Sequence, residues 1–320
     1  MSHVLALDLG GTKLSSALFN AEGEMLLPRR TELNGRVGEQ VGELIATEVA
    51  ERMAACVSLG LSLDSIGIAV PGSCNPTDGT VWAPNIPGWD KYPLRDLLRK
   101  AGNGLPVVVD DDRACSILGE RWQGNAKDVA NAIFLTVGTG IGAGILMNDV
   151  VLRGAHGTAG SLGWMGLGVD HQEVYAAVGD LEYHASGTGI ANAARRQVEA
   201  SPDYQGMLRG IQLSGQLTAS DVFAAYHTGD AIAVQVLDLC VKYWGVMVAN
   251  LVSLFDPEVI LFGGGVFGPA NSLLPMIREE ARKWAQPLSF PFVKIDGSAL
   301  GPQAVLYGAG SAALHEKTKS

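Results

Sequence analysis

The sequence has little basic charge, few cysteines and no long uncharged apolar run, and each shortage excludes a class of protein. Its 320 residues include 23 Lys and Arg against 33 Asp and Glu, for a formal net charge of −10. Since no run of basic residues occurs, nucleic acid and anionic membranes are not expected partners. The four cysteines lie far apart without a C-x-x-C pair, so we expect no disulfide framework and place the protein in a reducing cytoplasm.

Neither an export signal nor a membrane span is expected. The N-terminus, MSHVLALDLGG, lacks the basic and apolar regions of a signal peptide. The longest apolar stretch, Leu237–Phe255, contains Asp238, Lys242 and Asn250, which are costly inside a bilayer. We therefore expect a buried core helix at this stretch.

Hydrophobic residues and glycines are what the sequence has in abundance. Hydrophobic residues make up 47% of the chain, which is enough for a sizeable core in one large or two ordinary domains. The 41 glycines draw attention to loops in which the backbone itself has a function.

Short apolar runs and helical spacings alternate along the chain and predict an α/β fold. Val4–Asp8, Lys13–Phe19 and Glu24–Leu33 predict the three strands of an antiparallel meander. The other predicted strands are Ile66–Val70, Pro106–Val109, Ala132–Val137, Ala143–Met147, Glu258–Phe262 and Phe292–Ile295. Helices are predicted at Gly38–Leu59, Leu94–Ala101, Arg113–Trp122, Leu181–Glu199, Ala219–His227, Ala231–Phe255, Leu273–Trp284 and Pro302–Glu316.

A strand–glycine loop–strand unit occurs twice. ALDLGGTKLSSALF at residues 6–19 is echoed by FLTVGTGIGAGILM at residues 134–147. This weak likeness predicts an internal repeat, with two related halves that each open on a hairpin. We expect a boundary between two lobes near Asp110–Asp112, where a hinge would join them.

Three glycine clusters follow predicted strands, at residues 10–12, 138–142 and 263–265. Glycine at a strand end lets backbone N–H groups approach an anion closely. One such loop is more simply a tight turn, whereas three in one chain favour phosphate binding. None has the GK[ST] ending of a Walker A loop, and none is a G-x-G-x-x-G that opens a helix, so dinucleotide binding is not expected.

The motifs DLGGTK at 8–13, VGTGIGAGI at 137–145 and DPEVILFGGGV at 256–266 together resemble the ROK family of sugar kinases, in order and over essentially the whole chain. The resemblance implies a duplicated actin/hexokinase-like (ribonuclease H-like) ATPase fold with two lobes. Residues 1–111 would form the small lobe, with the C-terminal helix at 302–320 packed back on it, and residues 112–301 the large lobe. Some members are repressors with a DNA-binding domain before the first motif; here that motif begins within ten residues of Met1, so a kinase is expected.

The same resemblance implies a reaction and the residues that carry it. ATP with Mg²⁺ would phosphorylate the 6-hydroxyl of a hexose or hexose derivative, glucose or an amino sugar. Asp112 would be the catalytic base, and Asp8 an outer-sphere anchor for Mg²⁺. The implied ATP-binding residues are Asp8, Gly10, Gly11, Thr12, Lys13, Gly138, Thr139, Gly140, Gly187, Gly264 and Gly265, and the implied sugar-binding residues are Gly72, Asn85, Asp111, Ser161, Trp164 and Glu182. A homodimer is also expected.

Taken without the resemblance, the carboxylates allow plainer interpretations. Asp112 stands between a predicted strand and a predicted helix, where an acid can cap the helix or simply be solvated. Asp8 can be a turn residue, and Glu182 an ordinary first-turn helix residue. The functional interpretation of Asp112 is a general base that orients the attacking hydroxyl.

The chain departs from the family pattern near the sugar. Asp111 replaces an Asn, Ser161 replaces a Glu, and Trp164, which either stacks on the sugar or belongs to the core, replaces a His. The family's zinc-binding cysteine segment reads LGVDHQEVYAAVGDLE here, without a cysteine, so no structural zinc is expected. The added charge of Asp111 would either favour a cationic amino sugar or raise the pKa of one of the two acids, Asp111 and Asp112, through like-charge repulsion.

Two other functions stay open at this point. One is a sugar- or nucleotide-binding sensor without turnover, and the other is an actin-like filament protein. The sensor is disfavoured by the presence of Asp8, Thr12, Asp112 and Thr139, which an enzyme would need. The filament protein is disfavoured because Asp112 and Glu182 both stand where a sugar site would need them.

Overall fold

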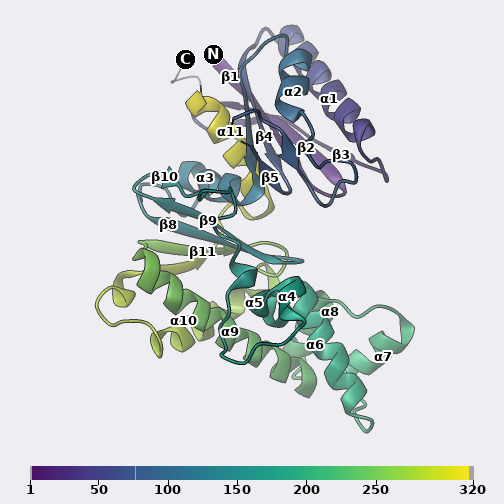
Figure 1. The fold of residues 1–320 in the computed structure, drawn as a ribbon, viewed down its shortest axis with the longest axis vertical. Coiled ribbons are helices and arrows are strands. Elements are labelled where there is room, and N and C mark those ends of the chain that lie inside the picture. The colour runs from purple at the N-terminus through teal and green to yellow at the C-terminus, as the bar shows by residue number, and fades with distance from the viewer. Residues whose placement is uncertain (1, 76, 317–320) are drawn as a thin grey trace. The chain divides into compact units, whose positions relative to one another are not determined.

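The computed structural model describes residues 2–75 and 77–316. The chain forms two compact units, which are described one by one (Figure 1). Unit 1 comprises the described residues of 1–128, 151–159 and 303–320, and unit 2 comprises residues 129–150 and 160–302. The lobe boundary expected between residues 111 and 112 stays a prediction, because the two units are defined by compactness and the expected lobes by motion about a hinge.

Unit 1 is built on a five-stranded sheet in the order β3-β2-β1-β4-β7. The strands are β1 (Ser2–Leu9), β2 (Lys13–Asn20), β3 (Met25–Glu32), β4 (Ser62–Val70) and β7 (Val107–Asp111). The first three form the predicted antiparallel meander, whereas β4 pairs in parallel with both β1 and β7. Asp8 therefore lies beside Ala69, and Val70 beside Asp111, at one edge where the carboxyl ends of β1, β4 and β7 meet.

Side chains of β1 alternate between two apolar layers, one on each face of this sheet. Leu5, Leu7 and Leu9 pack under α1 (Glu39–Ser58) and α2 (Leu94–Ala101). Val4 and Ala6 pack under α3 (Asp112–Gln123) and α11 (Ala304–Glu316) on the opposite face. By the same alternation, Asp8 is directed toward the face that carries α3.

Unit 2 repeats this plan. Its sheet has the order β10-β9-β8-β11-β12, so β8 takes the place of β1 and β9 that of β2. The strands are β8 (Ala132–Val137), β9 (Ile141–Met147), β10 (Val150–Val151), β11 (Val259–Gly263) and β12 (Lys294–Gly297). The internal repeat suggested by two short sequence segments is thus confirmed as a repeat of topology.

The helices of unit 2 correct one sequence prediction. The expected helix at Leu181–Glu199 is two helices, α5 (Asp180–Ala185) and α6 (Gly187–Ala200). Ser186 separates them, because its extended backbone ends α5 while its hydroxyl caps α6 by accepting from the Gly189 N–H at 3.0 Å. The remaining helices are α4 (Tyr175–Val178), α7 (Met207–Ser214), α8 (Ala219–His227), α9 (Ala231–Phe255) and α10 (Leu274–Arg282), of which α4 and α7 were not predicted.

Helix α9 is long and apolar enough to cross a membrane by length and composition. Its side chains nevertheless form the middle of the unit 2 core, where Trp244, Val248 and Leu251 are fully buried against β8, β11 and neighbouring helices. The sequence prediction of a buried core helix is confirmed.

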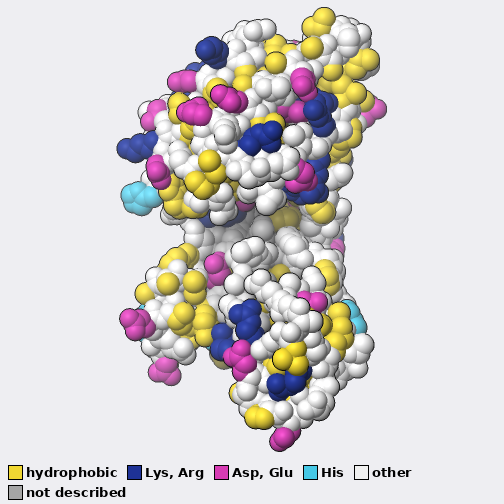
Figure 2. Space-filling view, turned by 90° about the vertical axis from the view of Figure 1, so that its right-hand side faces the viewer, with side chains coloured by type: hydrophobic (Ala, Val, Ile, Leu, Met, Phe, Trp, Pro, Cys, Tyr) yellow, Lys and Arg dark blue, Asp and Glu magenta, His cyan; other side chains and the backbone are white. Residues whose placement is uncertain are grey.

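The surface charges of both signs are interspersed on the face drawn in Figure 2. Lys and Arg side chains there lie among Asp and Glu rather than gathering into a broad patch of one sign. All four cysteines are free thiols, and Cys56, Cys115 and Cys240 are buried.

Candidate active site

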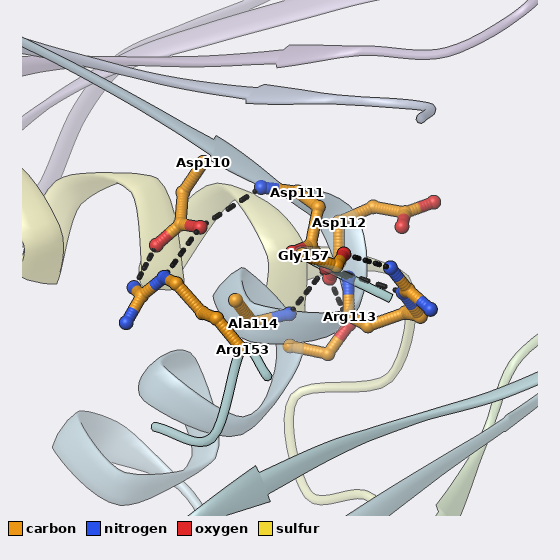
Figure 3. A network of polar contacts seen from close by, with 8 residues as sticks. Asp110, Asp111, Asp112, Arg113, Ala114, Arg153 and Gly157 are labelled. Carbon is orange, nitrogen blue, oxygen red and sulfur yellow. Dashed lines mark hydrogen bonds and ion pairs between the residues drawn. The ribbon is translucent and has the colours of Figure 1, made fainter. Parts of the chain in front are cut away.

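Three consecutive acids mark the junction of β7 and α3 in unit 1 (Figure 3). Asp111 is the N-cap residue of α3, and its Oδ1 accepts from the backbone N–H groups of Arg113 at 3.1 Å and Ala114 at 3.0 Å. Asp110 points to the opposite side from Asp112 and forms an ion pair with Arg153. The capping function that the sequence left open for Asp112 therefore belongs to Asp111, which leaves Asp112 available for chemistry.

Asp112 lies near Asp8, and the two carboxyl groups have similar electrostatics. Burial raises the pKa of Asp112 to about 6, with a further contribution from the charge of Asp111. Burial also raises the pKa of Asp8 to about 6, and the charge of Asp112 acts in the same direction. Two partly buried carboxylates that disfavour each other's charge are suited to a proton acceptor and to a cation placed beside it.

The loop between β1 and β2 lies close to two other predicted residues of unit 1. A β-carbon on Gly11 would lie 3.6 Å from Cβ of Asn85, so the glycine loop and Asn85 are neighbours. Gly10 donates its N–H to the Lys13 carbonyl at 2.8 Å, which closes the loop tightly. A β-carbon on Gly72 would approach the Trp82 carbonyl oxygen to 2.0 Å, so Gly72 is required by close backbone packing whatever else it does.

In unit 2, the equivalent loop joins β8 to β9 and borders a cavity of about 340 Å³. Four of the predicted nucleotide residues, Gly138, Thr139, Gly187 and Gly265, line this cavity together. The Gly187 N–H donates to the Gly138 carbonyl at 2.7 Å, which fixes the start of α6 against the loop. Residues that are more than 120 positions apart in the sequence thus line the same cavity.

Sequence reasoning missed the other side of this cavity. Its further polar lining residues are Thr188, Asn192, Arg195, Gln216, Thr218 and Ser220. Among the described residues that line the cavity, Arg195 is the single charged one. The spacing of 188, 192 and 195 places these residues on one face of α6, and that periodicity is the signal that could have identified them.

Glu182 is held against the glycine loop of unit 2. Its Oε2 accepts from the Ile141 N–H at 2.8 Å. A β-carbon on Gly140 would lie 2.5 Å from the same oxygen, and one on Gly163 would lie 2.6 Å from it. A side chain at position 140 would collide with the Glu182 carboxylate, so Gly140 is required there. An ordinary first-turn helix residue would not need this close contact with a loop.

Trp164 does not belong to the core, because 58% of the residue is exposed. Ser161 precedes it as the N-cap of the short 3₁₀ turn Leu162–Trp164. Of the two interpretations that the sequence left open for Trp164, core packing is therefore wrong. Stacking on a ligand stays a prediction.

Hydrogen bonds fasten the segment that follows Trp164. Asp180 is buried, and its Oδ2 accepts from the N–H groups of Leu167 at 2.8 Å and Gly168 at 3.3 Å. The Tyr175 hydroxyl and His184 Nε2 are 2.8 Å apart. Within residues 2–75 and 77–316, no three His, Cys, Asp or Glu side chains come together in a way that could hold a metal ion.

We expect the purified protein to carry no stoichiometric zinc and to keep its melting temperature in a chelator, because Asp180 and its hydrogen bonds hold the segment. Elemental analysis and a melting curve with and without chelator are the measurements. Asp180→Asn should lower the melting temperature, whereas Asp170→Asn, an exposed acid in the same segment, should not. About one zinc per chain, lost together with the fold in chelator, would contradict this prediction.

Comparison with known proteins identifies the family. The model of the ROK family matches residues 4–316, which is nearly the whole chain. This protein is a member of the ROK family. Its duplicated α/β architecture is the actin/hexokinase-like fold that the sequence motifs predicted.

Three relatives illustrate the range of the similarity. A glucokinase of Halalkalibacterium halodurans is 33% identical over 313 residues, covering 96% of this chain and 93% of the relative. A beta-glucoside kinase of Listeria monocytogenes is 32% identical over 268 residues and covers 82% of each chain. The crystal structure of a ROK family glucokinase from Streptomyces griseus in complex with glucose and AMPPNP is 29% identical, covers 98% of this chain and 99% of that chain, and has a TM-score of 0.79.

Proposed function

We propose that this ROK protein is an ATP- and Mg²⁺-dependent kinase that phosphorylates the 6-hydroxyl of a hexose or hexose derivative. The observation that carries the proposal is the Asp8–Asp112 pair at the carboxyl edge of the unit 1 sheet, where neither acid is used as the helix cap. Glucokinase and beta-glucoside kinase relatives support a sugar as the acceptor. A small-molecule enzyme of this kind would act in the cytoplasm as a homodimer.

The unit 2 cavity supports a nucleotide as the phosphoryl donor. A glycine loop, several residues with hydroxyl side chains and Arg195 line it, and no carboxylate is among the described lining residues. Such a surface suits a ligand that carries negative charge. We propose that Gly138, Thr139 and Gly140 hold phosphates and that Gly187, Gly264 and Gly265 lie along the nucleoside.

Asp8 and Asp112 together fit a divalent cation. Each carboxyl group has a pKa raised to about 6, so a nearby positive charge would favour the ionised form of both. We propose that Asp8 anchors the hydration shell of Mg²⁺, with Gly10, Gly11, Thr12 and Lys13 on the phosphate side. When bound, Mg²⁺ would neutralise charge on the transferring phosphoryl group.

Asp112 then acts as the general base. Its carboxylate orients the sugar hydroxyl and accepts the hydroxyl proton as the new O–P bond forms. A pKa of about 6 leaves most of the group ionised at neutral pH while making it a better proton acceptor than an ordinary exposed aspartate. Catalysis should therefore fall as the pH drops below about 6.

We propose that the sugar-binding residues are those that the family motifs indicate, Gly72, Asn85, Asp111, Ser161, Trp164 and Glu182. Asp111 is already paired with the Arg113 guanidinium, whose Nε lies 3.3 Å from Asp111 Oδ1. This pairing offsets the charge that would have favoured an amino sugar, so we propose a neutral hexose or glucoside as the preferred class.

A screen of sugars for ADP release tests this proposal. We expect glucose and a C1-substituted glucoside to have kcat/KM values within about 100-fold of each other, since Ser161 and Trp164 cannot make a charged hydrogen bond at that end. Because Arg113 already offsets the charge of Asp111, Asp111→Asn should leave the kcat/KM ratio between an amino hexose and glucose nearly unchanged. If none of the sugars tested causes ADP release at saturating ATP, the result would instead favour a binding sensor of the same fold.

A further inference from the structure

Arg195 on α6 has no polar partner among the residues that the structure describes. Its guanidinium forms no hydrogen bond, ion pair or ring contact with residues 2–75 and 77–316. The other four arginines of unit 2 each contact an aromatic ring, a backbone carbonyl or a carboxylate: Arg196, Arg209, Arg278 and Arg282. Arg195 instead lines the unit 2 cavity, and a guanidinium has five N–H donors and no acceptor. The residue therefore offers unused hydrogen-bond donors to a ligand in this cavity.

The position of Arg195 along α6 separates it from the glycine loop. Gly187, the first residue of α6, donates its N–H to the Gly138 carbonyl at 2.7 Å, so the helix begins against the loop proposed for the phosphates. Arg195 is eight residues further along α6. Because a helix rises about 1.5 Å per residue, its backbone lies roughly 12 Å from that of Gly187 along the helix axis. A nucleotide with its phosphates at the loop would therefore extend its nucleoside toward Arg195.

Helices α6 and α8 pack against each other, and both line the cavity beyond the glycine loop (Figure 1). Ala191 lies one turn before Arg195 on the same face of α6, and Leu217 precedes the first turn of α8. The side chains of Gln216 and Ser220 also line the cavity and make no hydrogen bond to the described residues. Apolar surface with a few polar groups suits the flat ring and polar edge of a nucleotide base.

We propose that Arg195 is a specificity-determining residue that holds the base of the nucleotide, so that the site selects a nucleotide over a base-free polyphosphate. This inference rests on the proposed kinase function and names the part of the phosphoryl donor that Arg195 recognises. The guanidinium stacks on the ring or donates to its nitrogen acceptors, and both contacts use its planar shape. A base-free polyphosphate in the same cavity would bring several negative charges to a single cation, which is a poorer match.

Binding measurements without sugar test the proposal, with labelled ADP as the ligand and with adenosine and inorganic tripolyphosphate as competitors. Adenosine has the base without phosphates, and tripolyphosphate has phosphates without a base. We expect Arg195→Ala to weaken the binding of ADP and adenosine by the same factor, about tenfold, and to leave that of tripolyphosphate within about twofold of wild type. A loss of tripolyphosphate affinity with unchanged adenosine affinity would show that Arg195 contacts phosphates and would overturn the inference.

Two further variants separate recognition of the base from an effect of charge. Arg195→Lys keeps the positive charge without the planar guanidinium, so adenosine should still bind about tenfold more weakly than to wild type. Arg196→Ala is the matched control, because Arg196 is the next residue of α6, contacts the Tyr183 ring and does not line the cavity. Nucleotide binding should stay near wild type in this control. Full recovery of adenosine binding in Arg195→Lys, or an equal loss in Arg196→Ala, would contradict the inference.

Melting curves show whether Arg195 has a structural role. Since Arg195 has no polar partner among the described residues, Arg195→Ala should melt near the wild-type temperature, and a strongly lowered melting temperature would contradict the inference.

The binding test does not depend on phosphoryl transfer, so the two proposals fail separately. If no sugar causes ADP release but Arg195→Ala still weakens ADP and adenosine, the kinase proposal fails and the inference stands. If sugar is phosphorylated but adenosine does not displace ADP from wild type, or Arg195→Ala leaves both affinities unchanged, the inference fails and the kinase proposal stands. Wild-type protein that binds neither ADP nor adenosine would overturn the inference as well.

Discussion

Asp112→Asn is expected to lower kcat by about 10²–10⁴-fold while the affinity for sugar changes little. Asparagine has the shape of aspartate but cannot accept the proton of the attacking hydroxyl. The N-cap of α3 is Asp111, so the substitution leaves the capping hydrogen bonds to Arg113 and Ala114 in place. The loss should therefore appear in kcat rather than in the sugar dissociation constant, measured by steady-state kinetics and calorimetry.

Stability measurements provide the control for this variant. The pKa of Asp112 is raised to about 6, so its ionised form is unfavourable to the folded state above that pH. Asp112→Asn should consequently melt at the same temperature as wild type or higher at pH 8. A near wild-type kcat would remove Asp112 from the role of base, and a strongly lowered melting temperature would show that the residue is structural.

Gly265→Leu is expected to raise the KM for ATP by about 100-fold or more with the fold intact. A β-carbon at Gly265 meets no atom within 4 Å, and the residue lines the unit 2 cavity. If the nucleotide binds in this cavity as proposed, the new side chain would take up part of its space without straining the backbone. Titration with ATP measures the change in KM, and melting curves measure whether the fold is intact.

Two nearby glycines make this experiment interpretable. Gly268 also has nothing within 4 Å of an added β-carbon but does not line the cavity, so Gly268→Leu should leave the KM for ATP near wild type. Gly264 has a φ of +86°, and its β-carbon would lie 2.4 Å from the Val137 carbonyl oxygen, so Gly264→Ala should instead lower stability. Unchanged ATP kinetics in Gly265→Leu would mean that the nucleotide does not use this cavity.

The sequence by itself predicted the elements whose signals are local. The meander of β1, β2 and β3, the helices α2, α8 and α9 and the glycine loops follow from apolar periodicity and turn residues, which act over a few positions. The prediction failed at Ser186, where a single residue ends one helix and caps the next within an otherwise continuous apolar pattern. It also missed α7, whose short length offers little periodicity.

Motif order determined the family, since three glycine motifs in sequence are far more specific than any one. It also directed attention to Asp8, Asp112 and Glu182 before any contact was known. These assignments came from position in a pattern, and their chemical roles stay predictions.

Only the tertiary structure decided how neighbouring side chains divide their tasks. Asp110, Asp111 and Asp112 are identical in type and adjacent in sequence, yet one pairs with Arg153, one caps α3 and pairs with Arg113, and one lies near Asp8. The same holds for Arg195 and Ser220, which line the unit 2 cavity with Gly138 although no local motif links them. Charge compensation and burial act through space between distant segments of the chain, so a one-dimensional pattern names the candidate acids but cannot tell which of them caps the helix and which of them pair with an arginine.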